Sequence, residues 1–441
     1  MRAAGSRPDP EQHKAGVEMS KGSVSFQIRQ WMKQAVQNIV LPFSYFLYRG
    51  RKIDPACVVF ADAHHSQRPE AMELLYRELQ KEGGWKIKEH YLDYQTAGAG
   101  AVAKHSVSFM KLYAGAGYVV ICDNFLPAAS CRKKDGTRVI QLWHACGSYK
   151  RFGYDAPDDI PPNYRGENVY RNTDLVTVSG KAAVGPFSSA MRLPETCIAP
   201  LGVSRTDLLL DEQWRAACRE RFFQKYPQAR GKKVLLWAPT FRGNAGRPQD
   251  VTLDLKALQE EMGDAWFVLG RPHPHMLHGT QGEQEKSRMQ DAFCSIPTEE
   301  MYPVVDVLIA DYSSLVYEYL LFKKPLVLYV PDLEEYRARR GFYMDITQIP
   351  AQIVTNREDL PGALERAAKE GLPEERTEQF LAEYMGACDG HATGRIAAWM
   401  REHRGREATG GRMQESRERQ ASGGRMRESS ERQASGGRSR D

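Results

Sequence analysis

Short runs of consecutive apolar residues alternate along most of the chain with longer segments whose apolar residues recur at helical spacing. Such runs are typical of parallel strands buried on both faces, and such segments are typical of the helices that cover them. Two series of this kind, joined near residues 201–232, predict an α/β protein with two Rossmann-like domains, at 54–205 and 206–400. The predicted strands are 58–61, 118–122, 139–143 and 175–178, then 234–238, 266–269, 307–310 and 326–330, with helices at 70–82, 104–114, 253–261 and 314–322.

Parallel sheets bind ligands at the carboxyl ends of their strands. A cleft between two such domains is therefore the expected place for a transferase site.

The segment before the first predicted strand, 23–53, has the pattern of an amphipathic helix. Its apolar residues are interleaved with polar ones, and it ends in aromatic residues followed by Arg49, Arg51 and Lys52. Aromatic rings and cations on one helix suit a membrane interface, where the rings lie at headgroup depth. A helix packed on the first domain accounts for the same pattern, so both interpretations stay open. Pro42 is expected to kink or end this helix.

Both ends of the chain are poor in apolar residues. Residues 1–22 are polar and rich in Gly, Pro and charge, and Met19 is an alternative start. Residues 401–441 contain a repeat with a period of 13 residues, seen at 408–420 and again at 421–433. Segments with so little to bury cannot offset the entropy of ordering, so we expect both to be disordered.

Charge and cysteine usage exclude several classes of protein. The formal net charge is +5, and residues 401–441, with 11 Arg and 7 acidic residues, supply +4 of it. The nearly neutral body lacks the basic stripe of a nucleic-acid binder. The eight cysteines show no Cys-x-x-Cys pair or zinc spacing, which predicts buried free thiols and no metal. Because no signal peptide or apolar stretch of membrane-spanning length is visible, a cytoplasmic location is expected.

A histidine follows the predicted strand 139–143. His144 lies where substrates bind in parallel sheets, and a neutral imidazole is suited to accept a proton from an attacking hydroxyl. A structural histidine is the competing interpretation. Cys146 nearby suggests a thiol nucleophile, but the sequence shows no partnered base for it.

Basic residues follow two strands of the second series. Arg242 comes after the strand 234–238, and Arg271 and His273 come after the strand 266–269. Arginine pairs with phosphate oxygens through its planar fork, although a solvated loop arginine is equally compatible with the pattern. His275 and His278 follow closely, but no carboxylate or thiol at ligand spacing accompanies the three histidines, so no metal site is predicted.

The strand 307–310 passes through a short hydroxyl-bearing turn directly into a helix. Asp311, Ser313 and Ser314 form this turn, and one of the two serines is the expected helix N-cap. The free N–H groups at a helix start also favour phosphate. Capping alone and phosphate binding both use this geometry.

In this order, the four segments resemble those of the CDP-glycerol glycerophosphotransferase family of teichoic-acid and related polymer synthesis. The family shows a Gln-x-Trp-His-Gly segment, an Ala-Pro-Thr-x-Arg strand end, an Arg-x-His-Pro strand end and an Asp-Tyr-Ser-Ser turn. Supporting similarities lie at 116–123, 202–208 and 332–343. The four segments stand here at 141–144, 238–242, 271–274 and 311–314, and the resemblance covers about 54–399.

The resemblance implies a GT-B fold in which the C-terminal domain binds the donor. It implies that His144 is the general base and that His273, Arg271 and Arg242 steady the donor phosphates. Ser313 and Ser314 would bind the diphosphate, and Glu318 the ribose or the glycerol. No cofactor or metal is implied, because these cations can supply the positive charge.

The implied partners are CDP-glycerol or a related CDP-alditol, a lipid-linked saccharide or polymer acceptor, and the cytoplasmic face of the membrane, with no nucleic acid. The chain departs from the family at 145–147, where Ala-Cys-Gly replaces Gly-Thr-Pro. We expect this loop to face the acceptor. Two other functions remain open, a nucleotide-sugar glycosyltransferase of the same fold and a non-catalytic membrane-associated binding protein.

Overall fold

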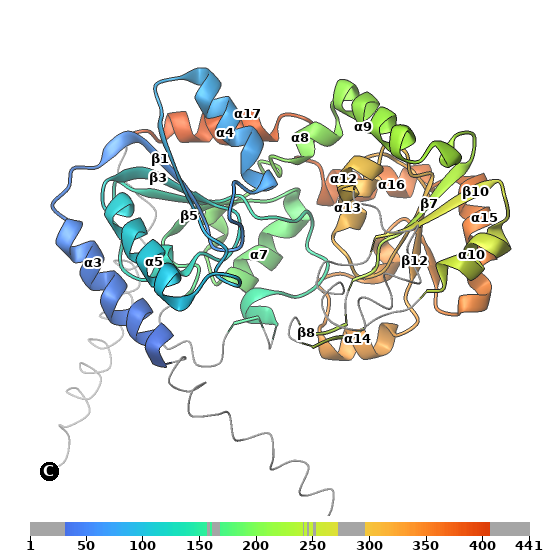
Figure 1. The fold of residues 1–441 in the computed structure, drawn as a ribbon, viewed down its shortest axis with the longest axis horizontal. Coiled ribbons are helices and arrows are strands. Elements are labelled where there is room, and N and C mark those ends of the chain that lie inside the picture. The colour runs from blue at the N-terminus through green and yellow to red at the C-terminus, as the bar shows by residue number, and fades with distance from the viewer. Residues whose placement is uncertain are drawn as a thin grey trace, which may run out of the picture.

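The computed structural model describes residues 31–156, 159–160, 168–240, 253–271 and 296–405, together with the backbone of two short strands at 242–244 and 247–249. Two α/β halves lie side by side, and each is built on its own sheet (Figure 1). Residues 1–22 and 406–441 lie outside the described residues. Residues 401–405, at the start of the predicted disordered tail, are described, and 401 and 402 end a helix.

The first half contains a six-stranded sheet in the order β2-β1-β3-β4-β5-β6, with all neighbouring strands parallel. Its core is a nearly continuous set of buried apolar residues on both faces, as the apolar runs predict. The strands are β1 (Asp54–Asp62), β2 (Lys86–Tyr91), β3 (Ala116–Ile121), β4 (Arg138–Gln141), β5 (Thr173–Thr177) and β6 (Ile198–Ala199).

The second half contains a five-stranded parallel sheet in the order β10-β7-β11-β12-β13. Its strands are β7 (Lys233–Trp237), β10 (Trp266–Gly270), β11 (Val307–Ala310), β12 (Leu326–Tyr329) and β13 (Gln352–Val354), with a separate antiparallel pair β8 (Arg242–Asn244) and β9 (Arg247–Gln249). All eight predicted strands are therefore present. The outer strands β2, β6 and β13 were not predicted from the sequence.

Helices cover both faces of each sheet (Figure 1). In the first half they are α3 (Leu41–Tyr48), α4 (Glu70–Glu82), α5 (Ala99–Tyr113), α6 (Leu126–Ala129) and α7 (Val184–Met191). They continue as α8 (Thr206–Leu209), α9 (Glu212–Lys225), α10 (Leu255–Met262), α12 (Thr298–Met301), α13 (Leu315–Leu320), α14 (Leu333–Arg339), α15 (Leu360–Glu370), α16 (Glu374–Tyr384) and α17 (Ala392–Glu402).

The last helix returns to the first half of the molecule. α17 lies beside α4 in Figure 1, and its residues Ile396, Ala397 and Met400 complete the core of the first sheet. The Tyr118 hydroxyl on β3 donates a hydrogen bond of 2.6 Å to the Met400 carbonyl. The range predicted for the second domain, 206–400, thus includes a helix that packs on the first. This crossing ties the two halves together at a second place, besides the connection after β6.

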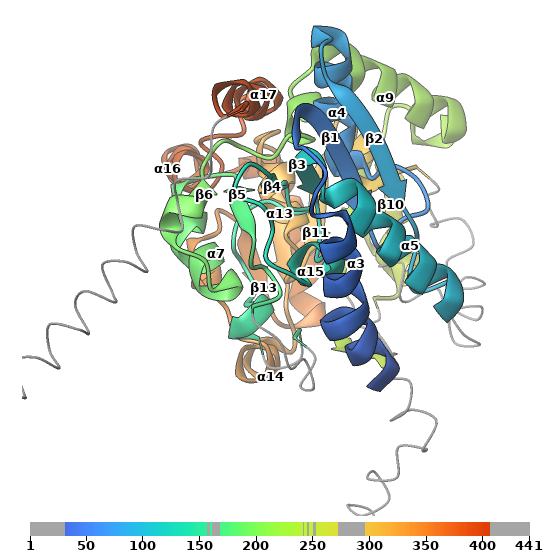
Figure 2. The same ribbon diagram turned by 90° about the vertical axis from the view of Figure 1, so that its left-hand side faces the viewer.

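The helix before β1 runs through Pro42 without a break, which corrects the expectation that it ends at that residue. A π-helical turn, η2 (Val36–Val40), directly precedes α3 and places Pro42 in the first turn of α3. The wider π-helical turn, in which the Leu41 N–H donates to the Val36 carbonyl, accommodates the proline ring and its missing N–H. One face of this helix packs on α5, as Figure 2 also shows, and buries Leu41 and Tyr45.

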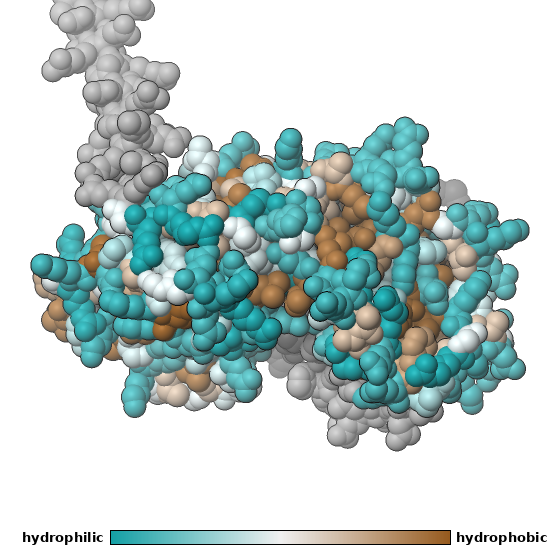
Figure 3. Space-filling view, turned by 90° about the horizontal axis from the view of Figure 1, so that it is seen from above, coloured by the Kyte–Doolittle hydropathy of each residue, from teal (hydrophilic) through white to brown (hydrophobic). Residues whose placement is uncertain are grey.

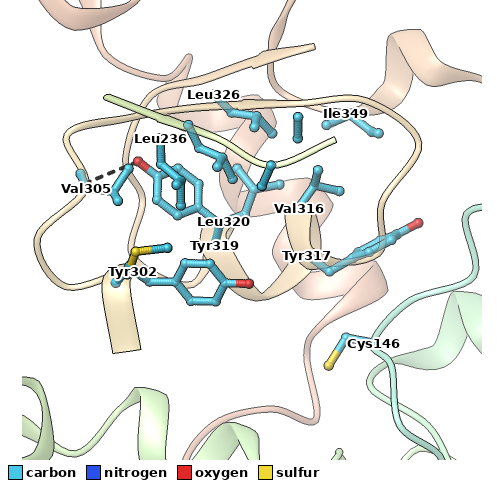
Figure 4. Close-up of a cluster of buried hydrophobic side chains, with 14 of the residues drawn as sticks. Cys146, Leu236, Tyr302, Val305, Val316, Tyr317, Tyr319, Leu320, Leu326 and Ile349 are labelled. Atoms are coloured by element: carbon cyan, nitrogen blue, oxygen red, sulfur yellow. Dashed lines mark hydrogen bonds between the residues drawn. The ribbon is translucent and has the colours of Figure 1, made fainter. Parts of the chain in front are cut away.

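One hydrophobic cluster includes residues from both halves. Cys146, from the loop after β4, lies at the edge of the large cluster that fills one face of the second sheet (Figure 4). The next residue, Gly147, has a φ of +65°, and a Cβ there would lie 2.3 Å from the Tyr317 ring. Only glycine satisfies both demands, so this contact fixes how closely the two halves approach.

Candidate active site

A histidine and a carboxylate meet at the carboxyl edge of the first sheet. Nδ1 of His144, after β4, lies 3.3 Å from Oδ2 of Asp123, after the neighbouring strand β3. The same ring nitrogen lies 3.4 Å from the Cys122 carbonyl oxygen. Both neighbours of Nδ1 are acceptors, so the proton of a neutral imidazole sits on Nδ1. Nε2 is then the nitrogen with a free lone pair. The His144 side chain is 49% exposed, so a substrate can reach it.

A strained turn aims His144 at this edge. Trp143 has a φ of +58°, in the left-handed region that non-glycine residues rarely adopt. The buried side chain of Gln141 holds the turn, since its Oε1 accepts from the Trp143 N–H and its Nε2 donates to the Asp123 carbonyl. The indole of Trp143 stacks on the His144 ring, with centroids 4.6 Å apart. Strain held in place by its surroundings is typical of functional sites.

Asp123 is the site residue that the sequence analysis missed as a functional group. Its segment, 116–123, was noted only as a supporting similarity. The available signal was an acidic residue directly after a buried strand, but a partner for His144 emerges only once β3 and β4 are known to be neighbours in the sheet. Their parallel register then places both residues at one edge.

At the carboxyl edge of the second sheet, the ends of three neighbouring strands come together. Asp311 follows β11 and is only 2% exposed. Its carboxylate accepts hydrogen bonds from the N–H and the hydroxyl of Thr240, after β7, at 3.0 and 2.9 Å. Arg271, after β10, donates its backbone N–H to the Trp237 carbonyl at 2.7 Å. Asp311 therefore joins the turn after β11 to the turn after β7. Half-buried side chains of Arg271, Ser313 and Ser314 lie at the same sheet edge.

The helix after Asp311 begins as predicted, but without a side-chain cap. Ser314 occupies the N-cap position with helical φ and ψ, and its hydroxyl makes no capping hydrogen bond. The closest substitute is the Ser313 hydroxyl, which lies 3.4 Å from the Leu315 N–H, beyond the usual length. Both hydroxyls are consequently available to a ligand at this turn.

Glu318, one turn further along α13, is buried between the two halves. It is 3% exposed, and its Oε1 accepts from Nη2 of Arg205, in the connection between the halves, and from the Cys146 thiol at 3.4 Å. A carboxylate held on both sides by protein groups is placed to join the domains. The burial of Glu318 does not support the expected contact with the ribose or the glycerol.

The loop at 145–147 is also placed differently from the expectation that it faces the acceptor. Cys146 is 1% exposed, and the Gly147 N–H donates to the Ser179 hydroxyl at 2.8 Å. Burial raises the pKa of the Cys146 thiol well above its usual range, which suits packing and not nucleophilic attack. The departure from the family pattern is therefore a contact between domains.

Two of the expected site residues are not placed. The Arg242 side chain and His273 lie outside the described residues, as do His275 and His278. Among the residues that the structure describes, no group of three or more His, Cys, Asp or Glu side chains is arranged to hold a metal ion.

The sequence matches the family CDP-Glycerol:Poly(glycerophosphate) glycerophosphotransferase over residues 43–401. A teichoic acid ribitol-phosphate primase of Bacillus spizizenii is 31% identical over 351 residues, which are 77% of this chain and 89% of that protein. A teichoic acid poly(ribitol-phosphate) polymerase of the same organism is 28% identical over 80% of this chain, which spans only 57% of that polymerase.

The fold has solved counterparts. The wall teichoic acid polymerase TagF superposes with a TM-score of 0.63 at 21% identity, over 86% of this chain and 98% of that one. A UDP-N-acetylglucosamine 2-epimerase from Listeria monocytogenes superposes with a TM-score of 0.51 at 13% identity, over 79% of this chain and 96% of that one. These similarities confirm the expected GT-B architecture. With the match over residues 43–401, they show that this chain belongs to the CDP-glycerol:poly(glycerophosphate) glycerophosphotransferase family.

Proposed function

We propose that this protein transfers glycerol phosphate, or a related alditol phosphate, from a CDP-alditol to a hydroxyl group of a membrane-linked acceptor and releases CMP. The observation that carries the proposal is the placement of His144 with Asp123 on one sheet edge and of the Asp311–Ser314 turn on the other. The contact between Cys146 and Glu318, at 3.4 Å, joins the loop after His144 to the helix after that turn. This contact supports the proposal that His144 and the Asp311–Ser314 turn act on one substrate between the two halves.

The chemistry follows from the orientation of His144. Nε2 takes the proton of the acceptor hydroxyl as its oxygen attacks the phosphorus that bears the alditol. The bond from that phosphorus to the oxygen bridging it to CMP breaks, and CMP leaves with the electron pair. Asp123, next to Nδ1, stabilises the imidazolium that forms.

The donor side of this proposal rests on the second sheet. The hydroxyls of Ser313 and Ser314 would contact the diphosphate, and Arg271, with the expected Arg242 and His273, would offset its charge. α13 has six residues, so hydroxyl and N–H groups at its start contribute more than the dipole of so short a helix. Asp311 and Glu318 hold these turns in place.

The relatives favour ribitol as a second candidate for the transferred group. The ribitol-phosphate primase aligns over 77% of this chain at 31% identity. A teichoic acid glycerol-phosphate primase of the same organism aligns over 52% at 26% identity. CDP-ribitol and CDP-glycerol differ only in the alditol, so both belong in the test.

The test is a donor panel. CDP-glycerol, CDP-ribitol and UDP-sugars are incubated with lipid-linked acceptors, and the nucleotide released and the product mass are measured. The proposal expects CMP and a product heavier by one or more alditol phosphates. Release of UDP from a UDP-sugar would instead identify a glycosyltransferase. Transfer from no donor, with acceptor binding retained, would identify a binding protein.

We also propose that the helix before β1 binds the cytoplasmic face of the membrane. The face away from α5 exposes seven large apolar side chains, and Lys33, Arg49, Arg51 and Lys52 around them are exposed as well. An apolar face of this kind with flanking cations suits anionic lipid. In the described residues no helix is long and apolar enough to cross a bilayer. The seven exposed apolar side chains of this helix are Trp31, Met32, Ile39, Val40, Phe43, Phe46 and Leu47, each 41–70% exposed.

Sedimentation with vesicles of anionic lipid tests this surface. The double substitution Phe43→Glu and Phe46→Glu is expected to lower the bound fraction at least fivefold, since two rings leave the interface and two negative charges enter it. The matched control adds two glutamates on exposed positions elsewhere, Gln213→Glu and Gln228→Glu. Equal binding of both variants would refute the surface.

A further inference from the structure

An open cavity of about 470 Å³ lies where the two halves meet, next to α14. One wall is the segment after the His144 loop, with Arg151 and Asp155. The opposite wall is the end of α14 and the chain that follows it. The lining of that second wall is Arg337, Ala338, Arg339, Arg340, Gly341, Phe342, Met344, Asp345 and Ile346.

The charge of the cavity favours an anion. Its lining contains four arginines and two aspartates. The aspartates are already hydrogen-bonded. Asp155 accepts from the hydroxyls of Ser189 and Tyr343, at 2.9 and 2.7 Å, and Asp345 accepts from Thr347. Guanidinium groups therefore outnumber carboxylates in the lining, four to two.

The arginines differ in how firmly they are held. Arg340 is tied to the opposite wall, since it pairs with Asp159 at 2.8 Å and donates to the Arg151 carbonyl. Arg337 forms an exposed pair with Glu334 within α14, and Arg151, Arg337 and Arg339 are all exposed to solvent. Such an exposed pair contributes little to stability, so these three side chains can turn to a ligand at small cost.

Aromatic contacts connect the cavity to both edges of the active site. Trp143, which stacks on His144, lies 5.0 Å from the ring of Phe152, and Phe152 lies 6.1 Å from Tyr343, whose hydroxyl bonds to Asp155. On the other side, Phe342 lies 5.6 Å from Tyr312 of the donor turn.

The backbones of the two walls pair as well. The Arg151 N–H donates to the Gly341 carbonyl and the Tyr343 N–H to the Tyr149 carbonyl. The cavity is thus a fixed neighbour of the site, joined to the His144 edge through Phe152 and to the Asp311–Ser314 turn through Phe342.

We propose that this cavity binds a phosphodiester group of the acceptor chain, and so holds the acceptor while its terminal hydroxyl reaches His144. The inference rests on the proposed function and names the place on this chain where the acceptor is held. The planar guanidinium groups match phosphate oxygens in pairs. The volume suits a group of this size. The donor diphosphate is the other source of the same chemistry, and the experiment separates the two.

The test measures binding by calorimetry, with three probes on the full chain. A synthetic trimer of glycerol phosphate stands for the acceptor, CMP for the donor, and free glycerol for an uncharged ligand. The double variant Arg337→Gln and Arg339→Gln removes two exposed charges from one wall, and Arg151→Gln removes one from the other. The control Arg219→Gln with Lys256→Gln removes two exposed charges from α9 and α10.

The double variant is expected to raise the Kd of the trimer about tenfold, which corresponds to about 1.4 kcal/mol, and to leave the Kd of CMP within about twofold. Arg151→Gln should act in the same direction, and the control should change neither. An unchanged Kd for the trimer in both cavity variants would overturn the inference. So would an equal rise for CMP, which would assign the cavity to the donor.

A parallel assay of transfer from CDP-glycerol and CDP-ribitol separates this inference from the function it rests on. Arginine-dependent binding of the trimer without any transfer would refute the proposed function and leave the cavity as a polyanion site. Transfer together with trimer binding that does not depend on the arginines would refute the cavity as the acceptor site and leave the proposed function standing.

Discussion

Replacing Asp123 by Asn tests whether the carboxylate supports His144 during proton transfer. The substitution keeps the size of the side chain and removes its charge. Two unit charges 3.3 Å apart attract by about 1 kcal/mol at the dielectric constant of water and by about 5 kcal/mol at an effective value of about 20. The two side chains are 49% and 32% exposed, so the lower part of that range applies. A loss of about 2 kcal/mol predicts a turnover number reduced about 30-fold.

The assay is the initial rate of acceptor-dependent CMP release, with kcat and the donor KM measured separately. Asp123 lies on the acceptor side, so kcat should fall and the donor KM should stay within about twofold. Asp264→Asn, an exposed charge beyond the site, is the matched control. A turnover number within about threefold of the wild type, in a folded Asp123→Asn protein, would refute the pairing of Asp123 with the base.

Two further predictions concern the contact between the halves. Gly147→Ala should lower the free energy of unfolding, measured by urea denaturation, by more than about 2 kcal/mol, because its Cβ would meet the Tyr317 ring at 2.3 Å and its φ is positive. The control Gly185→Ala, whose Cβ would have nothing within 4 Å, should not lower it. A Gly147→Ala protein as stable as the wild type would contradict the close approach of the two halves. Partial desolvation, and then the Glu299 carboxylate, raise the pKa of Glu70 from 4.5 to about 7. Between pH 4.5 and pH 7 the folded state therefore binds more protons than the unfolded state, so the free energy of unfolding falls as the pH rises through this range. Glu70→Gln should therefore raise Tm at pH 8 and leave it unchanged at pH 4, and an equal effect at both values would contradict this coupling.

Much of the fold followed from local pattern, because strands buried on both faces are continuous apolar runs. The strands that escaped prediction lie at or near sheet edges, where that signal fades. β2 begins Lys-Ile-Lys-Glu and has no buried residue, and β6 is two residues long. Pro42 was misjudged because the π-helical turn before it, which accommodates the ring, has no signature in the sequence.

The sequence predicted which site residues follow strands, but it did not predict which of them contact one another. His144 and the Asp311–Ser314 turn follow strands, and parallel topology alone places them at the sheet edges. Asp123 became a partner only through the order of β3 and β4 in the sheet. The burial of Glu318 and Cys146 depends on how the two halves dock, and no periodicity within one segment encodes such docking.

The central claim is that His144 activates an acceptor hydroxyl for attack on a CDP-alditol. The most direct measurement is a single-turnover reaction with CDP-glycerol or CDP-ribitol and a lipid-linked acceptor, comparing the wild type with His144→Gln. The account predicts CMP release matched by a gain of one alditol phosphate in the acceptor, with a rate reduced by about 10² or more in the variant and donor binding unchanged. An unchanged rate in His144→Gln, or CMP release without a gain in acceptor mass, would contradict it.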